Sequence, residues 1–407
     1  MLNLLKPIAM HEESVKEFKM DFIFPKKGTT VLAAAAIVGL VLTLLGFFAG
    51  GIDGHRFWAN ILLNGFMIIG LCLGAGFFVA VHLISESGWQ TAVQRIGEAI
   101  ASRIWLGALM MILIIFGAHS LYHWTHTEDL DALLQMKQPY LNLPFFIARM
   151  LFYLAGWIFL LGKIRQVSLM SDTNPDMKLF YRLRTYSAVF VVFFAITSST
   201  ASWDWLMSID AHWFSTLYGW YTFSGLFVNA IAVIIIFLVV LQKMGYMQHV
   251  NEEHMHDMGK YLFGFSIFWA YLWISQYLLI WYANIPEETT YFVTRIKGFE
   301  TLFYLNLIIC FVAPFFALMS RGSKRKSDWL LYVSIIVFMG HWVDLYLAIM
   351  PGAVGAEHAH IGLFEIGMTL VYVSVFAWFV FKALTKAKLV PENHPFYKES
   401  FDYENIK

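Results

Sequence analysis

The chain contains ten long runs of apolar residues, each followed by a polar or charged segment. An α-helix rises about 1.5 Å per residue, so about 20 apolar residues cross the hydrocarbon core of a bilayer. By this measure the runs lie near residues 30–50, 57–84, 102–122, 144–164, 184–202, 214–242, 260–283, 299–320, 328–350 and 362–384. The period-two alternation of a membrane β-barrel is absent. Because backbone groups in hydrocarbon must be hydrogen-bonded within their own segment, we expect an all-α integral membrane protein with ten transmembrane helices.

Composition supports the same class of protein. Hydrophobic residues make up 59% of the chain and charged residues 14%, whereas soluble domains are about one half apolar and about one quarter charged. The net charge of zero predicts no nucleic-acid partner. Cys72 and Cys310 lie in different apolar runs, which excludes a CxxCH motif for covalent haem and a disulfide framework. The segment from Met1 to Lys27 lacks the short apolar core of a signal peptide, so none is expected.

The distribution of Lys and Arg predicts the orientation of the helices. Most of the 28 Lys and Arg residues lie in the two tails and in the loops that follow the second, fourth, sixth and eighth runs. The exceptions are Arg56, Lys137, Arg149, Arg295 and Lys297. Since positively charged loops stay on the cytoplasmic side, both termini are predicted to be cytoplasmic. The expected organisation is a tail over 1–29, a transmembrane domain over 30–385 and a second tail over 386–407.

The second run carries glycines at closely spaced positions, Gly65, Gly70, Gly74 and Gly76. Small residues let helix backbones approach one another, so this helix is predicted to lie at the centre of a bundle. The same glycines leave a second interpretation open, which is room for a cofactor or a quinone tail.

Polar and helix-breaking residues interrupt the seventh and eighth runs. Pro314 should kink the eighth helix, because proline removes a backbone donor and neighbours or water must satisfy the freed carbonyl. Ser275, Gln276 and Tyr277 lie in the middle of the seventh run, and Asn306 lies in the eighth. Such groups either line a hydrated path or form hydrogen bonds between helices.

The segment SWDWLMSIDAHWFSTLYGWY, from Ser202 to Tyr221, joins two apolar runs and holds four tryptophans together with Asp204 and Asp210. Tryptophan and tyrosine concentrate where hydrocarbon meets water. No Lys or Arg occurs between Arg184 and Lys243, which places this segment on the non-cytoplasmic face. Two interpretations are open: an ordinary aromatic belt with two solvated acids, or a place where protons or a quinol head group are handled.

Several ionisable residues fall inside the runs, where each costs a few kcal/mol and is a functional candidate. His119, Arg149, Asp344 and Glu365 are expected in the outer half of the membrane, and His341 near the middle. His341 and Asp344 are three residues apart, so they share a helix face and can exchange a proton. The alternative is a structural ion pair in which Arg149 neutralises Asp344 or Glu365.

A second polar pair, His82 and Glu86, is expected at the cytoplasmic end of the second run. The two residues are four apart and would also share a helix face. Together with the outer cluster they resemble the two halves of a proton path, with His341 between them. The alternative is that both side chains extend to the membrane surface without a role in proton transfer.

The remaining histidines offer weaker sites. His123 and His126, in HWTHTEDLD, could bind a metal, but a solvated loop that docks a partner is the favoured interpretation. A bis-histidine haem needs two helical histidines at one depth, and His82, His119 and His341 are expected at different depths. We therefore expect neither haem nor metal on this chain, so any redox centre must belong to another subunit.

The motifs WDWLMSID (203–210), HWFSTLYGWY (212–221) and HWVDLYLAIMP (341–351), within ten spans, resemble the ActF-type membrane subunits of bacterial alternative complex III. Those subunits belong to the NrfD-like, or polysulfide-reductase membrane-subunit, family. The resemblance covers residues 30–385 and implies two four-helix bundles, about 57–202 and 214–350, with the first and last helices peripheral. It carries Asp204, Asp210, His341 and Asp344 over as proton-path residues.

The resemblance also implies a location and partners. It implies a multi-pass protein of the bacterial inner membrane, in a respiratory complex that passes electrons from quinol to an acceptor of the cytochrome c type. The implied partners are a homologous membrane subunit, periplasmic subunits that hold haem c and iron–sulfur clusters, lipid and a terminal oxidase. This chain would contribute proton half-channels and scaffolding, with no catalysis alone. No motif identifies quinol-binding residues, so a quinone pocket is left open.

Two other functions compete with this expectation. A secondary transporter is disfavoured because only Pro314 breaks a span, and no broken span occurs in the corresponding half. A structural membrane anchor predicts that the buried ionisable residues can be replaced with a loss of stability alone.

Overall fold

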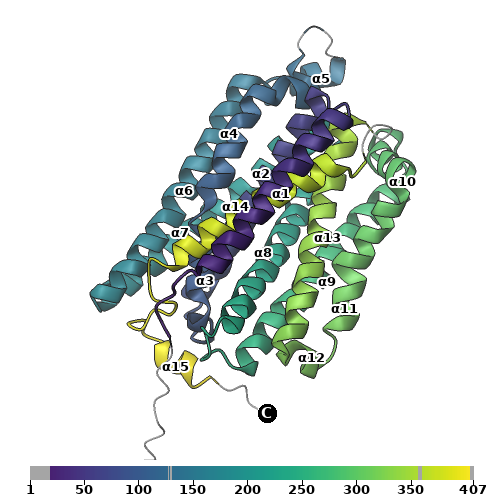
Figure 1. The fold of residues 1–407 in the computed structure, drawn as a ribbon. Helices are drawn as coiled ribbons and strands as arrows, with labels where there is room; N and C mark the ends of the chain where they lie inside the picture. Colours follow the sequence, from purple (N-terminus) through teal and green to yellow (C-terminus); the bar gives the residue numbers. More distant parts are fainter. Residues whose placement is uncertain (1–18, 127, 129–130, 356–359, 404–407) are drawn as a thin grey trace, which may run out of the picture.

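The computed structural model describes residues 19–126, 128, 131–355 and 360–403 of the chain. Its longer helices are α1 (Lys26–Ala49), α2 (Gly54–Ile84), α3 (Gln94–Ala101), α4 (Ile104–Leu121), α6 (Leu143–Thr173), α7 (Met177–Trp205), α8 (Leu217–Lys243), α9 (Glu252–Ala283), α10 (Pro286–Leu307), α13 (Ser327–Val354) and α14 (Leu363–Leu384). The shorter ones are α5 (Ala132–Lys137), α11 (Ala313–Ala317), α12 (Arg321–Arg325), α15 (Tyr397–Phe401), three 3₁₀ turns, η1 (Trp89–Ala92), η2 (His123–Thr125) and η3 (Met207–Asp210), and one π-helical turn, η4 (Ile308–Val312). The long helices run side by side along one direction (Figure 1).

The described residues contain ten helical segments long and apolar enough to cross a membrane. The third segment consists of α3 and α4, and the eighth of α10, η4 and α11. The other eight segments are single helices. The predicted all-α architecture with ten spans, and with it a multi-pass membrane protein, is therefore confirmed.

Polar side chains at the ends of the apolar runs determine where several helices begin. Asp53, Asn142 and Asp176 each accept a hydrogen bond from a backbone N–H in the first turn, at the starts of α2, α6 and α7. Asn251 forms a capping box with His254 at the start of α9. Such caps satisfy backbone donors that have no partner inside the helix.

Helices α2 and α8 form the centre of the molecule, between the other long helices (Figure 1), and most of their residues are buried. The two helices meet at Gly74, where an added Cβ would lie 2.6 Å from the Cβ of Ala230 and 2.8 Å from the carbonyl oxygen of Leu226. Only glycine permits so close an approach of the backbones. The predicted central position of the second span is confirmed.

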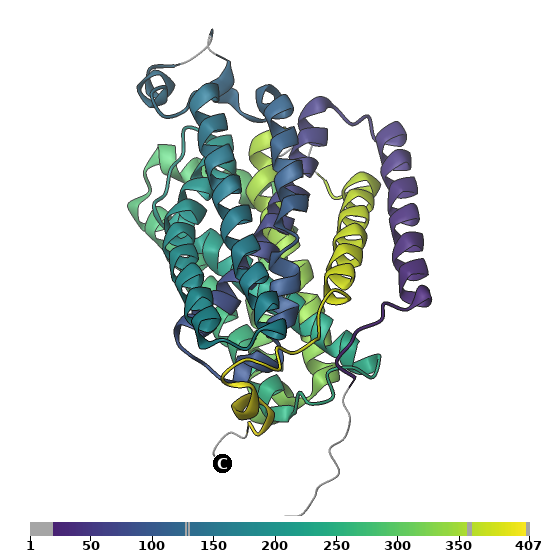
Figure 2. The ribbon, with the colours of Figure 1, turned by 90° about the vertical axis from the view of Figure 1, so that its left-hand side faces the viewer.

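Helices α1 and α14 lie side by side at the edge of the molecule (Figure 2). Their backbones meet at Gly39 and Gly367, since a Cβ added to Gly39 would lie 2.9 Å from the carbonyl oxygen of Gly367. This arrangement agrees with the expectation that the first and last spans are peripheral. The division of the other eight helices into two bundles stays a prediction.

The described parts of both terminal segments lie at the same end of the helices (Figure 1). Asp21 pairs with Lys388 in an isolated antiparallel bridge, and the Leu389 N–H donates to the Met20 carbonyl at 2.8 Å. That this end faces the cytoplasm stays a prediction from the charge pattern.

The eighth span departs from α-helical geometry just before Pro314. The π-helical turn η4 precedes α11, which has Pro314 in its first turn, and Phe299 also has a non-helical conformation inside α10. Because proline cannot donate a backbone hydrogen bond, the turn before it loosens to a wider ring. Asn306 lies two residues before this turn, in the last turn of α10.

The tail that follows α14 docks against the loops at its end of the bundle. The Ser400 hydroxyl accepts from the Ala92 N–H and donates to the Trp89 carbonyl, both at 3.0 Å. The ring of His394 packs between Phe180 and Phe396, and its Nδ1 lies 3.3 Å from the Thr91 hydroxyl.

Acid is expected to release this tail. Burial lowers the pKa of His394 from 6.5 to about 4, and the nearby Arg95 also lowers it, while Glu98 raises it. Between these two values His394 is neutral in the docked tail and protonated in the free tail. The free energy of docking therefore becomes less favourable as the pH falls from about 6.5 to about 4, by up to about 3 kcal/mol. Limited proteolysis should cut the tail faster at pH 5 than at pH 7.5.

A His394→Phe variant should lose a large part of this pH dependence. It should not lose all of it, because burial also lowers the pKa of His249 to about 4, and that ring stacks on Phe401 of the same tail. The control is His123→Phe, which changes an exposed histidine at the other end of the molecule. Equal pH dependence in all three proteins would contradict the prediction.

Candidate functional site

Asp344 in α13 lies where four helices meet. Its carboxylate accepts a hydrogen bond from Asn306 Nδ2 at 2.8 Å, one from Trp269 Nε1 at 3.2 Å and one from the Tyr221 hydroxyl. These donors belong to α10, α9 and α8, and all three are neutral. Asp344 is only 8% exposed. Among the described residues no arginine or lysine lies within 4.0 Å of this carboxylate, so a change in its protonation would break no such ion pair.

His341 lies one helical turn before Asp344. Its Nδ1 is 3.9 Å from Asp344 Oδ2, and no other basic group of the described residues comes within 4.0 Å of that carboxylate. The ring is 2% exposed, and neither nitrogen has a hydrogen-bond partner in the described part of the chain. Buried polar groups are nearly always hydrogen-bonded, to water where no protein group is available. The prediction that the two side chains share a helix face is confirmed.

Two small cavities of about 30 Å³ each border Asp344. One also borders His341 and Asn229, and the other borders Arg295 and Gln276. One water molecule needs about 10–15 Å³ of such space, so each cavity has room for about two. The carboxylate is therefore next to two spaces that can each hold water.

Arg295 lines the second cavity and is bound to Asp210. Arg295 Nη2 donates to Asp210 Oδ2 at 2.9 Å, and its other nitrogens donate to the Leu347 and Tyr291 carbonyls. Arg295 is 3% exposed, whereas the Asp210 side chain is 26% exposed. Asp210 therefore links a buried arginine to the surface at the end of the bundle that holds the aromatic segment.

Asp204 is bound to Arg149 and is fully buried. Arg149 Nε and Nη2 each donate to this carboxylate at 2.8 Å, and the Tyr153 hydroxyl donates at 3.2 Å. The alternative that Arg149 neutralises Asp344 or Glu365 is wrong. Helices α6 and α7 are consecutive and antiparallel, so the start of α6 faces the end of α7.

Glu365 is bound to Arg56 in α2 rather than to Arg149. Arg56 Nε and Nη2 donate to its two oxygens at 2.8 and 2.9 Å, and Asn60 Nδ2 donates at 3.1 Å. Glu365 also accepts from the Gly362 N–H at 2.8 Å, which caps the start of α14. Its contacts therefore join the peripheral helix α14 to the central helix α2.

His119 is exposed at the end of α4, and its depth in the membrane stays a prediction. It lies in the last turn of α4, its ring centroid is 3.9 Å from that of His126, and its Nδ1 is 3.1 Å from the Thr125 hydroxyl. The described residues contain no group of three or more candidate metal ligands. Residues 127, 129 and 130 of the histidine-rich loop lie outside the described part.

His82 and Glu86 do not form the expected pair. Helix α2 ends at Ile84, and Glu86 adopts a positive φ of 54° beyond it. Glu86 pairs with Arg184 at the surface. His82 is buried at 3% exposure, with Nδ1 2.7 Å from the Phe78 carbonyl and Nε2 3.0 Å from the Tyr261 hydroxyl.

An aromatic layer separates His82 from Asp344. Tyr261, which contacts His82, and Trp269, which donates to Asp344, are eight residues apart in α9, or about 12 Å. Phe265 lies between them, stacked on Tyr261 and edge-on to Phe227 at 4.5 Å. The two polar regions are thus divided by packed rings.

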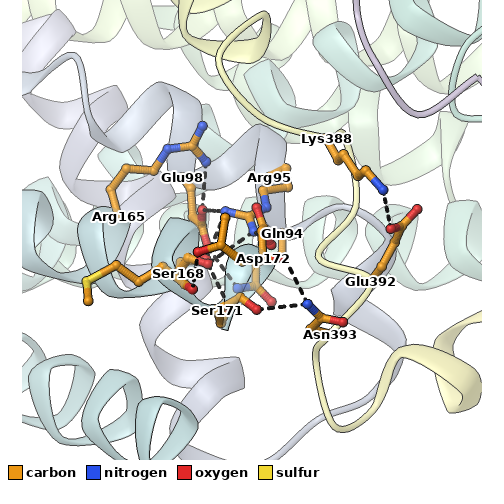
Figure 3. Close-up of polar contacts among 12 residues, drawn as sticks. Gln94, Arg95, Glu98, Arg165, Ser168, Ser171, Asp172, Lys388, Glu392 and Asn393 are labelled. Carbon is orange, nitrogen blue, oxygen red and sulfur yellow. Dashed lines mark hydrogen bonds and ion pairs between the residues drawn. The ribbon is translucent and has the colours of Figure 1, made fainter. Parts of the chain in front are cut away.

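A buried ionic network, which was not predicted from the sequence, lies near His394. Arg165 Nη1 and Arg95 Nη1 donate to Glu98 Oε2 at 2.7 and 3.0 Å, and Arg95 Nη2 donates to Asp172 Oδ1 at 2.5 Å. Figure 3 shows both arginines pointing toward Glu98, with the tail residue Asn393 beside Asp172. Glu98 and Arg95 are almost fully buried.

One sequence signal could have found this network. Gln90, Gln94 and Glu98 are spaced four residues apart, and their side chains form a ladder in which Gln94 Nε2 donates to Glu98 Oε1 at 2.8 Å. The third apolar run is predicted to begin near residue 102, so these positions fall outside the predicted spans. In the structure they form η1 and α3, which are folded inward and covered by the tail.

The chain was compared with protein-family models and with curated proteins, and it matches none of them.

Proposed function

We propose that this chain is the proton-conducting and scaffolding membrane subunit of a respiratory quinol oxidoreductase complex of the NrfD-like type. One observation carries the proposal: Asp344 is buried among neutral donors, beside an imidazole without hydrogen bonds to described residues, and it lines two water-sized cavities. Each of the four other acids predicted for the path pairs with an arginine. They are Glu86, Asp204, Asp210 and Glu365.

In this proposal the outer half of the path runs from Asp210 past Arg295 and the second cavity to Asp344. Arg295 is a fixed positive charge and carries no proton itself, so it sets the local potential while water in the cavity relays the proton. His341 then exchanges protons with Asp344.

The inner half of the proposed path begins at His82 and Tyr261 and at the network around Glu98. Phe265 and its ring neighbours separate the two halves, so a proton crosses only when water or a side-chain rotation bridges the layer. A proton moved across the membrane potential stores about 2.3 kcal/mol per 100 mV, so redox chemistry in partner subunits must drive it. Quinol oxidation supplies both the protons and the energy.

Gentle purification tests the respiratory role. A tag at Lys407 should co-purify a homologous membrane subunit and polypeptides with c-type haem and iron–sulfur clusters, with visible haem absorbance and quinol-dependent reduction of an acceptor. A colourless chain that stays folded alone would contradict the proposal and favour the transporter.

A further inference from the structure

A large cavity lies between the peripheral pair α1 and α14 and the central helices α2 and α8, with α13 also contributing. Its volume is about 640 Å³. Cavities of about 300–1,000 Å³ hold ligands of drug size. Its floor is formed by Met67, Ile68 and Leu71 of α2, which are 2–3% exposed.

The lining of this cavity is almost purely hydrocarbon. Among the described residues that line it, Lys27 alone carries a polar side chain, and the others are aliphatic, aromatic, glycine or proline. An apolar cavity excludes water. A quinone ring needs hydrogen-bond partners for its two oxygens, and the walls supply none beyond the ammonium group of Lys27. The chemistry fits a hydrocarbon chain with a single anionic end.

Lys27 stands where that anionic end would lie. It is exposed in the first turn of α1, at the border of the cavity. Within the described residues no carboxylate comes within 4.0 Å of its ammonium group, whereas Lys243, at the same end, pairs with Asp328. The rings of Phe24 and Phe381 stack on each other with their centroids 5.0 Å apart, and Phe237 packs edge-on against Phe381. All three rings line the same cavity as Lys27.

We propose that this cavity binds one anionic phospholipid, with an acyl chain between α1–α14 and α8 and its phosphate beside Lys27. The lipid fills the space that the α1–α14 pair leaves against the central helices. It thereby extends the contact that Glu365 and Arg56 make at the other end of α14. This site is independent of the proton path around Asp344.

The test uses the purified complex in mild detergent, with bound lipids quantified by mass spectrometry after extensive washing. Wild type should retain about one anionic phospholipid per chain at this site. Lys27→Gln should lower that retention about fivefold, since one lysine near a headgroup contributes about 1 kcal/mol. Lys26→Gln is the matched control, because Lys26 carries the same charge one residue earlier but does not line the cavity.

A second variant tests the hydrocarbon part. Ala377→Trp places an indole in the cavity and should abolish retention, whereas Val192→Trp, on the exposed face of α7, should retain the lipid. Added phosphatidylglycerol should raise the melting temperature of delipidated wild type more than phosphatidylcholine does, and it should leave Ala377→Trp unchanged.

Three outcomes would overturn the proposal. Equal retention in Lys27→Gln and Lys26→Gln would show that Lys27 does not hold the phosphate. A quinone retained in place of phospholipid would identify the cavity as a site for an isoprenoid tail. Unchanged retention in a folded Ala377→Trp protein would place the lipid elsewhere.

Discussion

An Asp344→Asn variant is expected to lose proton translocation at least about tenfold, while the complex still assembles. A positioned acid or base contributes about 10²–10⁴-fold to a proton transfer, and Asp344 is the predicted path acid that forms no ion pair with an arginine of the described residues. An amide keeps the size of the side chain, but its single oxygen can replace only one of the two acceptors, either Oδ1, which accepts from Asn306, or Oδ2, which accepts from Trp269. It cannot carry the proton. Quinol oxidation and proton release should be measured together in vesicles that contain the whole complex.

Glu86→Gln is the matched control for this experiment. It makes the same carboxylate-to-amide change in a side chain that is 44% exposed and paired with Arg184 at the surface. Its proton translocation should equal that of wild type. An assembled Asp344→Asn complex with unchanged turnover and unchanged proton translocation would remove Asp344 from the path, and the structural-anchor interpretation would then be favoured.

Breaking the Arg149–Asp204 pair is expected to give the largest loss of stability. Asp204→Asn leaves the guanidinium of Arg149 buried without its counter-charge, which costs about 3–5 kcal/mol for a buried pair. Replacing both partners, as Arg149→Met with Asp204→Leu, removes both charges and should recover most of that loss. Unfolding in a graded series of denaturing detergent compares the single and double variants.

The surface pair formed by Arg184 and Glu86 provides the reference. Removing it with Arg184→Gln should cost less than about 1 kcal/mol, because solvent screens exposed pairs. If Asp204→Asn were instead as stable as wild type but lost proton translocation, Asp204 would belong to the proton path, as its motif predicts. Function retained by the double variant would assign the pair to structure.

The aromatic layer around Phe265 explains why two predicted polar clusters do not meet. Sequence periodicity places His82 and His341 on different helices. Neither of these two runs contains Phe265, the α9 residue that lies between Tyr261, which contacts His82, and Trp269, which donates to Asp344. One face of α9 carries Tyr261, Phe265 and Trp269, which are spaced four residues apart. This face therefore contacts both polar regions and also contributes the ring that separates them. In the proposed mechanism, the reorganisation of this layer is the step that redox chemistry must drive.

The sequence by itself determined the features that depend on local chemistry. The ten helices follow from apolar length, because a segment in hydrocarbon must satisfy its own backbone. The distortion before Pro314 follows from a missing donor, and the contact of His341 with Asp344 follows from helical spacing.

Only the tertiary structure decided which charges meet. Arg56 and Glu365 are separated by 309 positions in the chain, and they meet because α2 and α14 come together in the fold. Arg149 pairs with Asp204 because α6 and α7 pack as neighbours. Glu86 does not lie on the predicted helix face, because α2 ends two residues before it. Glu98 is buried because α3 packs inward and is covered by the tail. The rotation of each helix about its axis, and which helices pack against each other, depend on how complete helix surfaces fit together. The spacing of residues along one apolar run carries no information about either.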